Sequence, residues 1–270
     1  LGGILLDRSH SPLKLTPAGE LFHAYLERQG FLDRQLVSDL RDLQDKKRPV
    51  LHIGVSPWRG SNLVPDILPL FAEQYPDVQV VLHEAPVPEL GELAAANVID
   101  FCVMQTPADL TELTYEPVMR ERVFLVGHRD HPLLQGLDST YDAPRPFPDL
   151  RLLEHERVIM LPPEWRLSRL LYNTFSVHSV EPQNILVTTN TTTAINLAAE
   201  KMGFAFLQES GVPRTPYLDR LACFTVGEPP LTCPLVVVYK KNGFLSPAAR
   251  TFIDRIREFY SRYDRPADAK

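Results

Sequence analysis

The sequence lacks the features that mark several classes of protein. Its three cysteines, Cys102, Cys223 and Cys233, are an odd number without a CxxC spacing, which argues against a disulfide framework and against a zinc site. No stretch approaches the roughly 20 apolar residues that span a bilayer. The first residues do not follow the basic and then apolar pattern of a secretory signal. We therefore expect a cytoplasmic protein without a membrane partner.

Motifs of catalysis and metal binding are also missing from the sequence. There is no nucleophile elbow, no phosphate-binding loop and no carboxylate pair in matched surroundings, so we expect neither an enzyme nor a bound cofactor. The histidine cluster at residues 128–131 (HRDH) lacks further ligands, which favours a solvated turn over a metal site. Cys102 is expected in the core. A redox pair of Cys223 with Cys233 is less favoured than two unrelated thiols.

The most informative stretch is residues 49–84. With 44% hydrophobic and 23% charged residues, the 270-residue chain has the composition of one large or two ordinary globular domains. Val50 to Val55 predicts a strand that ends at Ser56-Pro57, and a helical period follows with Ser61 as its expected N-cap. A second strand is predicted at 78–82. Two parallel strands joined by a helix are the basic unit of an α/β sheet.

The turn after this first strand is a candidate ligand site. In a parallel sheet it lies at the carboxyl edge, where free N–H groups of the next helix favour an anion or a carboxylate. Alternatively, serine and glycine only shape the turn and the arginine is solvated; the residues alone leave both interpretations open. The strand predicted at 99–104 ends at the same edge, so its last polar residues would face the same crevice. The candidates are Ser56, Trp58, Arg59, Gly60, Ser61, Gln105 and Thr106.

The first 48 residues show a different pattern. Residues 1–15 have two short apolar pieces around a basic, Ser-rich tip and predict a hairpin. Thr16-Pro17 is a good helix start, and a helix is expected from 17 to about 47. Its apolar stripe calls for a partner helix, most simply a second copy of the chain; a helix lying along its own domain is the alternative. The stripe contains Leu21, Tyr25, Leu32, Leu36, Leu40 and Leu43.

Several short motifs together resemble the LysR-type transcriptional regulators. They are residues 15–20 (LTPAGE), 51–54 (LHIG), 75–78 (YPDV) and 245–249 (LSPAA), which occur in the family's order and cover nearly the whole chain. The resemblance implies an α/β fold: a two-subdomain effector domain like a periplasmic binding protein (type 2), preceded by a wing remnant and a long linker helix. It implies no catalytic residues.

The resemblance also implies a division of the chain. Residues 1–15 would be the remnant of the wing of a winged helix-turn-helix, and 16–48 the linker and dimerisation helix. Subdomain I would comprise 49–122 and 242–263, and subdomain II 123–241, with the two crossings near 121–123 and 240–243. Because the chain begins at Leu1 without methionine, we expect it to be part of a longer protein.

Contacts with DNA are expected only near the start of the chain. Residues 1–48 carry eight Lys/Arg and seven Asp/Glu, a net charge of +1, which leaves −7 for the remainder when the total is −6. An acidic effector domain has no electrostatic footprint for DNA, so the wing would make the contacts. Without the resemblance these residues would be interpreted as a solvated loop. They are Arg8, Ser9, His10 and Lys14.

A second wall of the site is implied at residues 188–193, a run of five threonines and an asparagine before a predicted helix. In the family this helix start faces the effector, and hydroxyls with free N–H groups suit a small anion. A threonine-rich cap facing solvent is the alternative. The candidates are Asn190, Thr191 and Thr192.

The sequence thus predicts a DNA-binding regulator, a homodimer or homotetramer. Its small, anionic effector would bind between the subdomains and change the arrangement of the oligomer on DNA. A periplasmic-type solute-binding or transport receptor is the alternative, and an enzyme on the same architecture ranks third.

Overall fold

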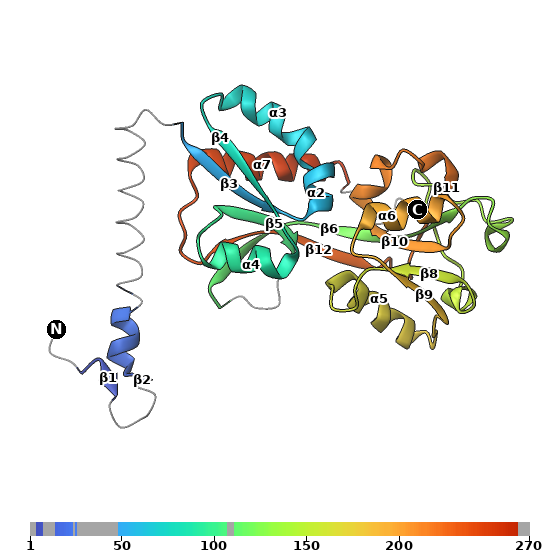
Figure 1. The fold of residues 1–270 in the computed structure, drawn as a ribbon, viewed down its shortest axis with the longest axis horizontal. Helices are drawn as coiled ribbons and strands as arrows, with labels where there is room; N and C mark the ends of the chain where they lie inside the picture. Colours follow the sequence, from blue (N-terminus) through green and yellow to red (C-terminus); the bar gives the residue numbers. More distant parts are fainter. Residues whose placement is uncertain (1–3, 8–13, 24, 26–47, 107–110, 264–270) are drawn as a thin grey trace.

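Two α/β subdomains lie side by side and are joined by two long strands (Figure 1). The structure, a computed structural model, describes residues 4–7, 14–23, 25, 48–106 and 111–263, and the statements below concern these residues. None of the described helices is long and apolar enough to cross a membrane.

The predicted hairpin and helix start at the beginning of the chain are confirmed. β1 (Leu6–Asp7) pairs antiparallel with β2 (Lys14–Leu15). The Thr16 hydroxyl accepts a hydrogen bond from Gly19 N at 3.0 Å, as an N-cap does, and residues 17–23 are helical. A Cβ on Gly19 would lie 2.0 Å from the Leu5 carbonyl oxygen, so only glycine lets the helix approach the hairpin this closely.

The predicted dimerisation stripe is described only at its start. Leu21 and Tyr25 are 76% and 55% exposed, so the described part of the chain does not cover them. The rest of the stripe and most of the wing tip lie outside the described residues, namely Leu32, Leu36, Leu40, Leu43, Arg8, Ser9 and His10. Their roles stay predictions.

Subdomain I is a parallel sheet with helices on both faces (Figure 1). Its elements are β3 (Val50–Val55), α2 (Pro57–Asn62), α3 (Val64–Gln74), β4 (Gln79–Glu84), α4 (Val87–Ala95), β5 (Phe101–Gln105) and α7 (Pro247–Ser261). Alternate residues of β3, such as Ile53, pack with Phe71 of α3 and Phe252 of α7. The opposite face packs against Leu90 of α4. Asn97, with φ of 56°, ends the α4 segment in the left-handed conformation that asparagine tolerates.

The prediction that Ser61 caps the helix after β3 is wrong. Ser56 is the cap, and its hydroxyl accepts from Arg59 N at 3.4 Å. Pro57 occupies the first helical position, which its fixed φ favours, so the helix begins five residues earlier than expected. Pro65 has no N–H to continue the ladder, and the chain breaks at Leu63 into α2 and α3. Ser61 is exposed and donates its hydroxyl to the Pro57 carbonyl at 3.0 Å.

Two antiparallel strands connect the subdomains. β6 (Leu113–His128) is one continuous strand of 16 residues. β12 (Thr232–Lys240) pairs with β6 along its whole length and with β5 from Leu235 onward. Leu235 and Val237 lie in the core of subdomain I, so the return crossing precedes Leu235 rather than lying at 240–243. An apolar strand has the same pattern in either subdomain, which explains the error.

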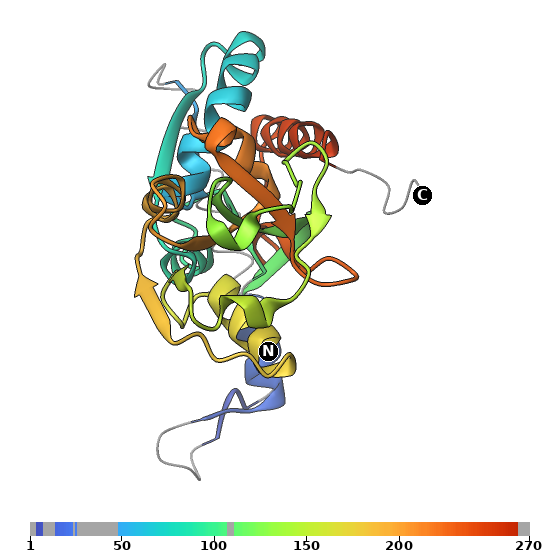
Figure 2. The same ribbon diagram turned by 90° about the vertical axis from the view of Figure 1, so that its right-hand side faces the viewer.

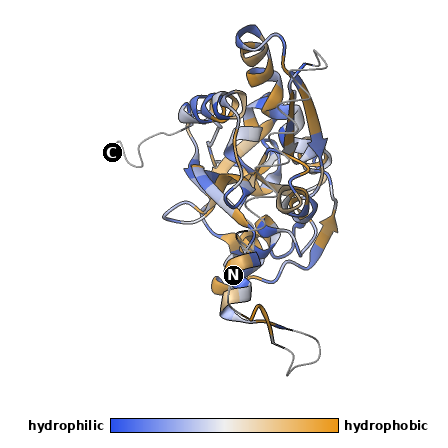
Figure 3. Cartoon of the chain, turned by 90° about the vertical axis from the view of Figure 1, so that its left-hand side faces the viewer, coloured by the Kyte–Doolittle hydropathy of each residue, from blue (hydrophilic) through white to orange (hydrophobic). Residues whose placement is uncertain are grey.

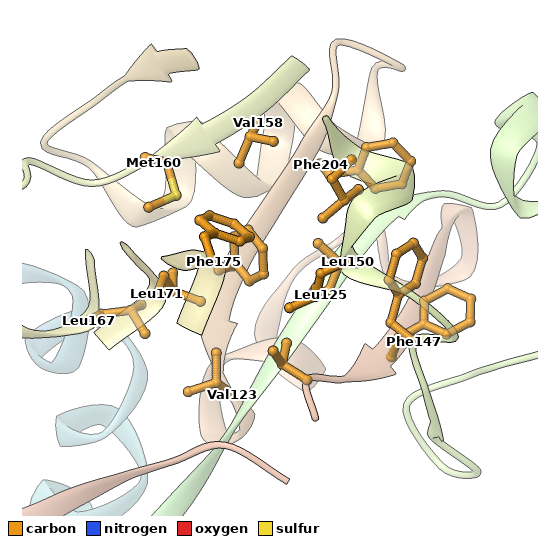
Figure 4. Close-up of a cluster of buried hydrophobic side chains, with 14 of the residues drawn as sticks. Val123, Leu125, Phe147, Leu150, Val158, Met160, Leu167, Leu171, Phe175 and Phe204 are labelled. Atoms are coloured by element: carbon orange, nitrogen blue, oxygen red, sulfur yellow. The ribbon is translucent and has the colours of Figure 1, made fainter. Parts of the chain in front are cut away.

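Subdomain II has a second sheet, seen from its far end in Figure 2. Its elements are β7 (Arg145–Pro146), β8 (Arg157–Met160), α5 (Arg166–Val177), β9 (Asn184–Val187), α6 (Thr191–Ala199), β10 (Phe204–Gln208), η3 (Glu209–Arg214) and β11 (Leu221–Thr225). Phe175 of α5 packs edge-on against Phe206 with centroids 5.7 Å apart, on the face that also carries Leu125 (Figure 4). Ala194 and Ala198 of α6 pack on the opposite face of the sheet.

Residues 135–150 form a mostly exposed, irregular segment whose few buried side chains pack on subdomain II. Phe147 is 6% exposed and lies edge-on to Phe224 with centroids 5.3 Å apart, and Leu150 is buried beside it (Figure 4). The Ser139 hydroxyl donates to the Cys223 carbonyl at 2.5 Å. This irregular segment therefore covers one end of the core of subdomain II. The helices carry both hydrophobic and hydrophilic residues, as elements with one buried side do (Figure 3).

Glu116 ties α7 to the crossing strands. Partial burial would raise the pKa of this carboxyl, but hydrogen bonds from Tyr239, Arg250 and Arg257 outweigh it and lower the pKa from 4.5 to about 2. A carboxyl whose pKa is lower in the folded state adds stability above its unfolded pKa. That contribution disappears as the pH falls from about 4.5 towards about 2.

We expect Glu116→Gln to remove this part of the acid sensitivity. Urea unfolding at about pH 7 should give a lower free energy of unfolding for the variant than for the wild type, and the difference should shrink towards about pH 2.5. A difference that stays constant with pH would show that the Glu116 contacts do not lower its pKa.

Candidate functional site

The directions of the strands place the candidate site. β3, β4 and β5 are mutually parallel, and β5 runs in the direction of β6 because both are antiparallel to β12. β10 runs against β6, and β8 and β9 run with β10. The carboxyl ends of the two sets of strands therefore face each other across the crossing. Ligands of α/β sheets bind outside the carboxyl ends of the strands.

The sequence-predicted residues lie at these facing edges. On the side of subdomain I, Ser56 follows β3, and Gln105 and Thr106 end β5. On the side of subdomain II, Asn190 precedes α6 after β9, and Thr191 begins that helix. Two turns that the sequence did not single out share the edge of subdomain II, the start of α5 after β8 and the η3 segment after β10.

Three contacts join the edges directly. The Trp58 indole lies against η3, so closely that a Cβ on Gly211 would be 1.7 Å from its Cζ2 atom. Arg166 of α5 donates from Nη1 to the Thr106 carbonyl at 3.0 Å. Arg214 of η3 forms an ion pair with Asp66 of α3. The carboxyl edge of subdomain I is therefore in direct contact with the carboxyl edge of subdomain II.

Arg59 points into the protein rather than into the cleft. The residue is 4% exposed, its Nη2 lies 2.5 Å from Glu121 Oε2, and its Nη1 donates to Tyr260 Oη at 2.6 Å. Burial would lower the pKa of the Arg59 guanidinium, but Glu121 and Tyr260 together raise it above its usual value. Neither sequence-based alternative, a counter-charge for a ligand or a solvated side chain, fits this position.

The hydrogen bonds around Arg59 connect α2 with β6, α7 and η3. Glu121 is fully buried on β6 and also accepts from the Ser210 hydroxyl of η3. Tyr260 comes from α7, and burial raises the pKa of its phenol well above 10. A turn of the candidate site is thus connected to both subdomains. Gly60 is part of the same packing, because a Cβ there would lie 1.9 Å from Glu84 Oε1.

A second buried carboxylate, Glu209, lies at the crossing. It is 1% exposed and accepts from Arg122 Nε at 2.9 Å. Sequence reasoning missed the residues of both networks because their partners are far apart in the chain. The one available signal was the charged triplet at 120–122 inside an otherwise apolar strand.

Four nearly buried polar side chains have no hydrogen-bond partner within the described ranges, namely Gln105, Thr191, Gln208 and Thr225. Gln105 is 9% and Thr191 8% exposed, and within the described ranges neither side chain forms a hydrogen bond, although their polar atoms reach solvent. Buried polar groups normally bond to protein, water or a ligand. Asn190 differs, since its Oδ1 accepts from Thr193 N at 3.2 Å and caps α6. Thr192 is exposed.

The cysteines and histidines form no reactive cluster in the described part of the chain. All three thiols are free, and burial raises the pKa of Cys102 and Cys223 to about 12 and that of Cys233 to about 11. Cys223 and Cys233 belong to different core clusters, so the alternative of a redox pair is wrong. Nowhere among the described residues do three His, Cys, Asp or Glu residues gather as a metal would require.

A separate surface pocket of about 310 Å³ lies in subdomain II, away from the facing edges. It contains part of the HRDH segment. Its charged lining is His128, Arg129, Asp130, Glu200, Lys201, Asp219 and Arg220. Cations and carboxylates alternate there, and Arg220 pairs with Glu200 at 2.9 Å. A solvated charged surface, as the sequence favoured, accounts for these contacts.

Sequence comparison finds relatives along nearly the whole chain. A family model described as "LysR substrate binding domain" matches residues 44–261. A "Probable RuBisCO transcriptional regulator" from Trieres chinensis is 24% identical over 258 residues, covering 93% of this chain and 81% of the relative. The "Uncharacterized HTH-type transcriptional regulator YybE" from Bacillus subtilis is 23% identical over 265 residues, covering 97% and 85%.

Structure comparison finds the same fold. Full-length BenM superimposes with a TM-score of 0.64 at 22% identity and covers 100% of this chain and 86% of BenM. The BenM effector binding domain with its effector benzoate gives 0.66 at 21% identity, covering 82% and 98%. The regulatory domain of Synechocystis CcmR in complex with 2-PG gives 0.64 at 21% identity, covering 78% and 97%.

Proposed function

The chain belongs to the LysR family of transcriptional regulators, and from this premise we propose that it binds a small anionic effector between its two subdomains and so alters the oligomer on DNA. The resemblance predicted from sequence is confirmed. The two-subdomain α/β fold is confirmed as well. The relatives are regulators rather than transport receptors or enzymes.

One observation carries the proposed site. The facing carboxyl edges hold nearly buried polar side chains without a hydrogen bond in the described ranges, Gln105 on subdomain I, and Thr191 and Gln208 on subdomain II. A ligand that reaches both edges would satisfy them together and would favour the closed arrangement. Ser56, Trp58, Thr106, Asn190 and Thr192 complete the proposed lining, whereas we assign Arg59, Gly60 and Ser61 to the support of the turn.

An anion suits the start of α6. Asn190 caps only the Thr193 N–H, which leaves other N–H groups of the first turn for a ligand. BenM and CcmR are solved with benzoate and 2-PG, and QuiR with shikimate, all small molecules. We propose a small organic acid for this chain too.

The route from the effector to DNA passes through the first 48 residues. We propose residues 1–15 as part of the wing, with the exposed Lys14 among its DNA contacts, and 16–48 as the helix that forms a dimer or, through further contacts, a tetramer. An effector shifts the arrangement only through different affinities for the two states. Such a regulator acts in the cytoplasm.

A thermal-shift screen of the 270-residue chain with aromatic and short-chain carboxylates tests the proposal. A binding acid at about 100 times its Kd adds about 2.7 kcal/mol to the free energy of unfolding. Thr191→Val should weaken that acid about fivefold, the worth of one hydrogen bond, and should leave the unliganded Tm unchanged because the hydroxyl has no partner.

Thr193→Val is the matched control on the same helix, since Thr193 is exposed and contributes only its backbone N–H to the cap. Equal binding by wild type and Thr191→Val would remove Thr191 from the site. A lower unliganded Tm would assign it a structural role instead.

A further inference from the structure

Arg166 is one of the side chains that span the facing edges. It occupies the first position of α5, directly after the turn that follows β8, and remains exposed. Its Nη1 donates to the Thr106 carbonyl on the opposite subdomain at 3.0 Å. This bond uses one of the five guanidinium N–H donors. The remaining N–H donors lie in one plane and can form paired hydrogen bonds to the oxygens of a carboxylate or phosphate.

The charge of Arg166 is not compensated locally. At the crossing Arg59 pairs with Glu121, Arg122 with Glu209 and Arg214 with Asp66. Among the described residues no carboxylate lies within ion-pair distance of Arg166. Within the described structure, the Arg166 guanidinium is therefore without an ion-pair partner.

The charge of Arg166 also affects the Cys233 thiol at the start of β12. Burial is the main cause of its raised pKa, the nearby Glu121 adds to the rise, and Arg166, Arg59 and Arg120 oppose it. Arg120 also lacks a carboxylate partner in the described structure, but it is exposed and donates to the Thr232 hydroxyl at 3.1 Å.

The position of Arg166 is unfavourable for a cation without a ligand. The amino end of a helix carries partial positive charge, and α5 has no acidic residue in its first turn. Trp165, its N-cap residue, makes no side-chain cap bond, so several N–H groups of the first turn lack a capping partner as well. Next to Thr106, the nearly buried Gln105 side chain is unpaired within the described ranges. A bound anion would pair with the Arg166 guanidinium and accept hydrogen bonds from the free N–H groups of α5 and from the Gln105 side chain.

We propose that Arg166 recognises the oxyanion group, carboxylate or phosphate, of the effector. The proposal rests on the function proposed above and names the residue that selects the charge of the ligand. The guanidinium donates paired hydrogen bonds to the anion while it reaches from subdomain II to the strand end of subdomain I. Binding therefore holds the subdomains together and excludes uncharged analogues of the same shape.

The two tryptophans of the chain supply the readout. Trp58 lies on α2 and Trp165 next to Arg166, so intrinsic fluorescence reports on both sides of the cleft. The 270-residue chain is titrated with sodium benzoate and with inorganic phosphate, with sodium chloride at matched ionic strength as reference. We expect a saturable change with at least one of the two anions.

Arg166→Gln should raise the apparent Kd about 10- to 100-fold, the loss of charge-assisted hydrogen bonds, and Arg166→Lys should fall between it and the wild type. Arg169→Gln is the matched control, since Arg169 lies exposed one turn further along α5. It should bind like the wild type. The urea midpoint of Arg166→Gln should equal that of the wild type, because only an exposed bond is lost.

Two results would overturn the proposal in distinguishable ways. Equal affinity of wild type and Arg166→Gln for an anion that binds would exclude Arg166 and leave the cleft site standing. No saturable response of any variant to either anion would remove the oxyanion site altogether, and with it the anionic effector.

Discussion

Replacing Glu121 by glutamine is expected to lower the free energy of unfolding by about 3–5 kcal/mol, because the change leaves a buried cation without its counter-charge. Arg59 is 4% exposed and Glu121 is fully buried, so water cannot substitute for the lost carboxylate. The Ser210 hydroxyl would lose its ionic acceptor as well. Urea unfolding monitored by circular dichroism measures the effect.

Glu200→Gln is the matched control for this variant. Glu200 pairs with Arg220 at 2.9 Å, but both side chains are exposed, and such pairs contribute about 0–1 kcal/mol. A double variant, Arg59→Leu with Glu121→Leu, should lose less than the sum of its single variants, since no charge is left buried alone. A loss below about 1 kcal/mol for Glu121→Gln would mean that Arg59 is solvated and that the network is not closed.

Gly211→Ala is expected to separate the two edges at Trp58 and to destabilise the chain by about 1–3 kcal/mol, as overpacking does. The added Cβ would lie 1.7 Å from Trp58 Cζ2, so either the indole or η3 must move. The Trp58 fluorescence should change accordingly. Effector binding should weaken too, since the closed arrangement becomes less favourable.

Gly91→Ala serves as the control for glycine replacement. A Cβ at Gly91 on α4 would meet its nearest neighbours only at 4.0 Å, so alanine should be neutral or stabilise by up to about 1 kcal/mol. Trp58→Leu in the Gly211→Ala background should restore part of the lost stability because the smaller side chain leaves room. An unchanged Tm for Gly211→Ala would contradict the contact between Trp58 and η3.

The features that sequence predicted correctly depend on local physics. The N-cap at Thr16 and the strand ends at Ser56 and Thr106 each follow from residues within one turn of the chain. Because parallel strands share a carboxyl edge, strand ends alone also indicated which polar turns meet. The order of strands and helices alone was enough to predict that the turns on the two subdomains face each other.

The errors involve competing signals or distant partners. Ser56 and Ser61 are both plausible caps, and the prolines at 57 and 65 decided where the helices begin. The fate of Arg59 depends on Glu121 and Tyr260, which are 62 and 201 residues away. Periodicity carries no information on such pairs. Arg166 has no sequence signal either, since an exposed arginine at a helix start resembles any solvated side chain.

Hydrogen exchange with and without the organic acid that gives the largest thermal shift tests the cleft most directly. Binding between the carboxyl edges predicts added protection in peptides that cover 56–62, 104–106 and 188–194, with peptides of the separate pocket at 128–130, 199–201 and 219–220 unchanged. Protection confined to that pocket, or absent from both walls of the cleft, would contradict an effector site between the subdomains.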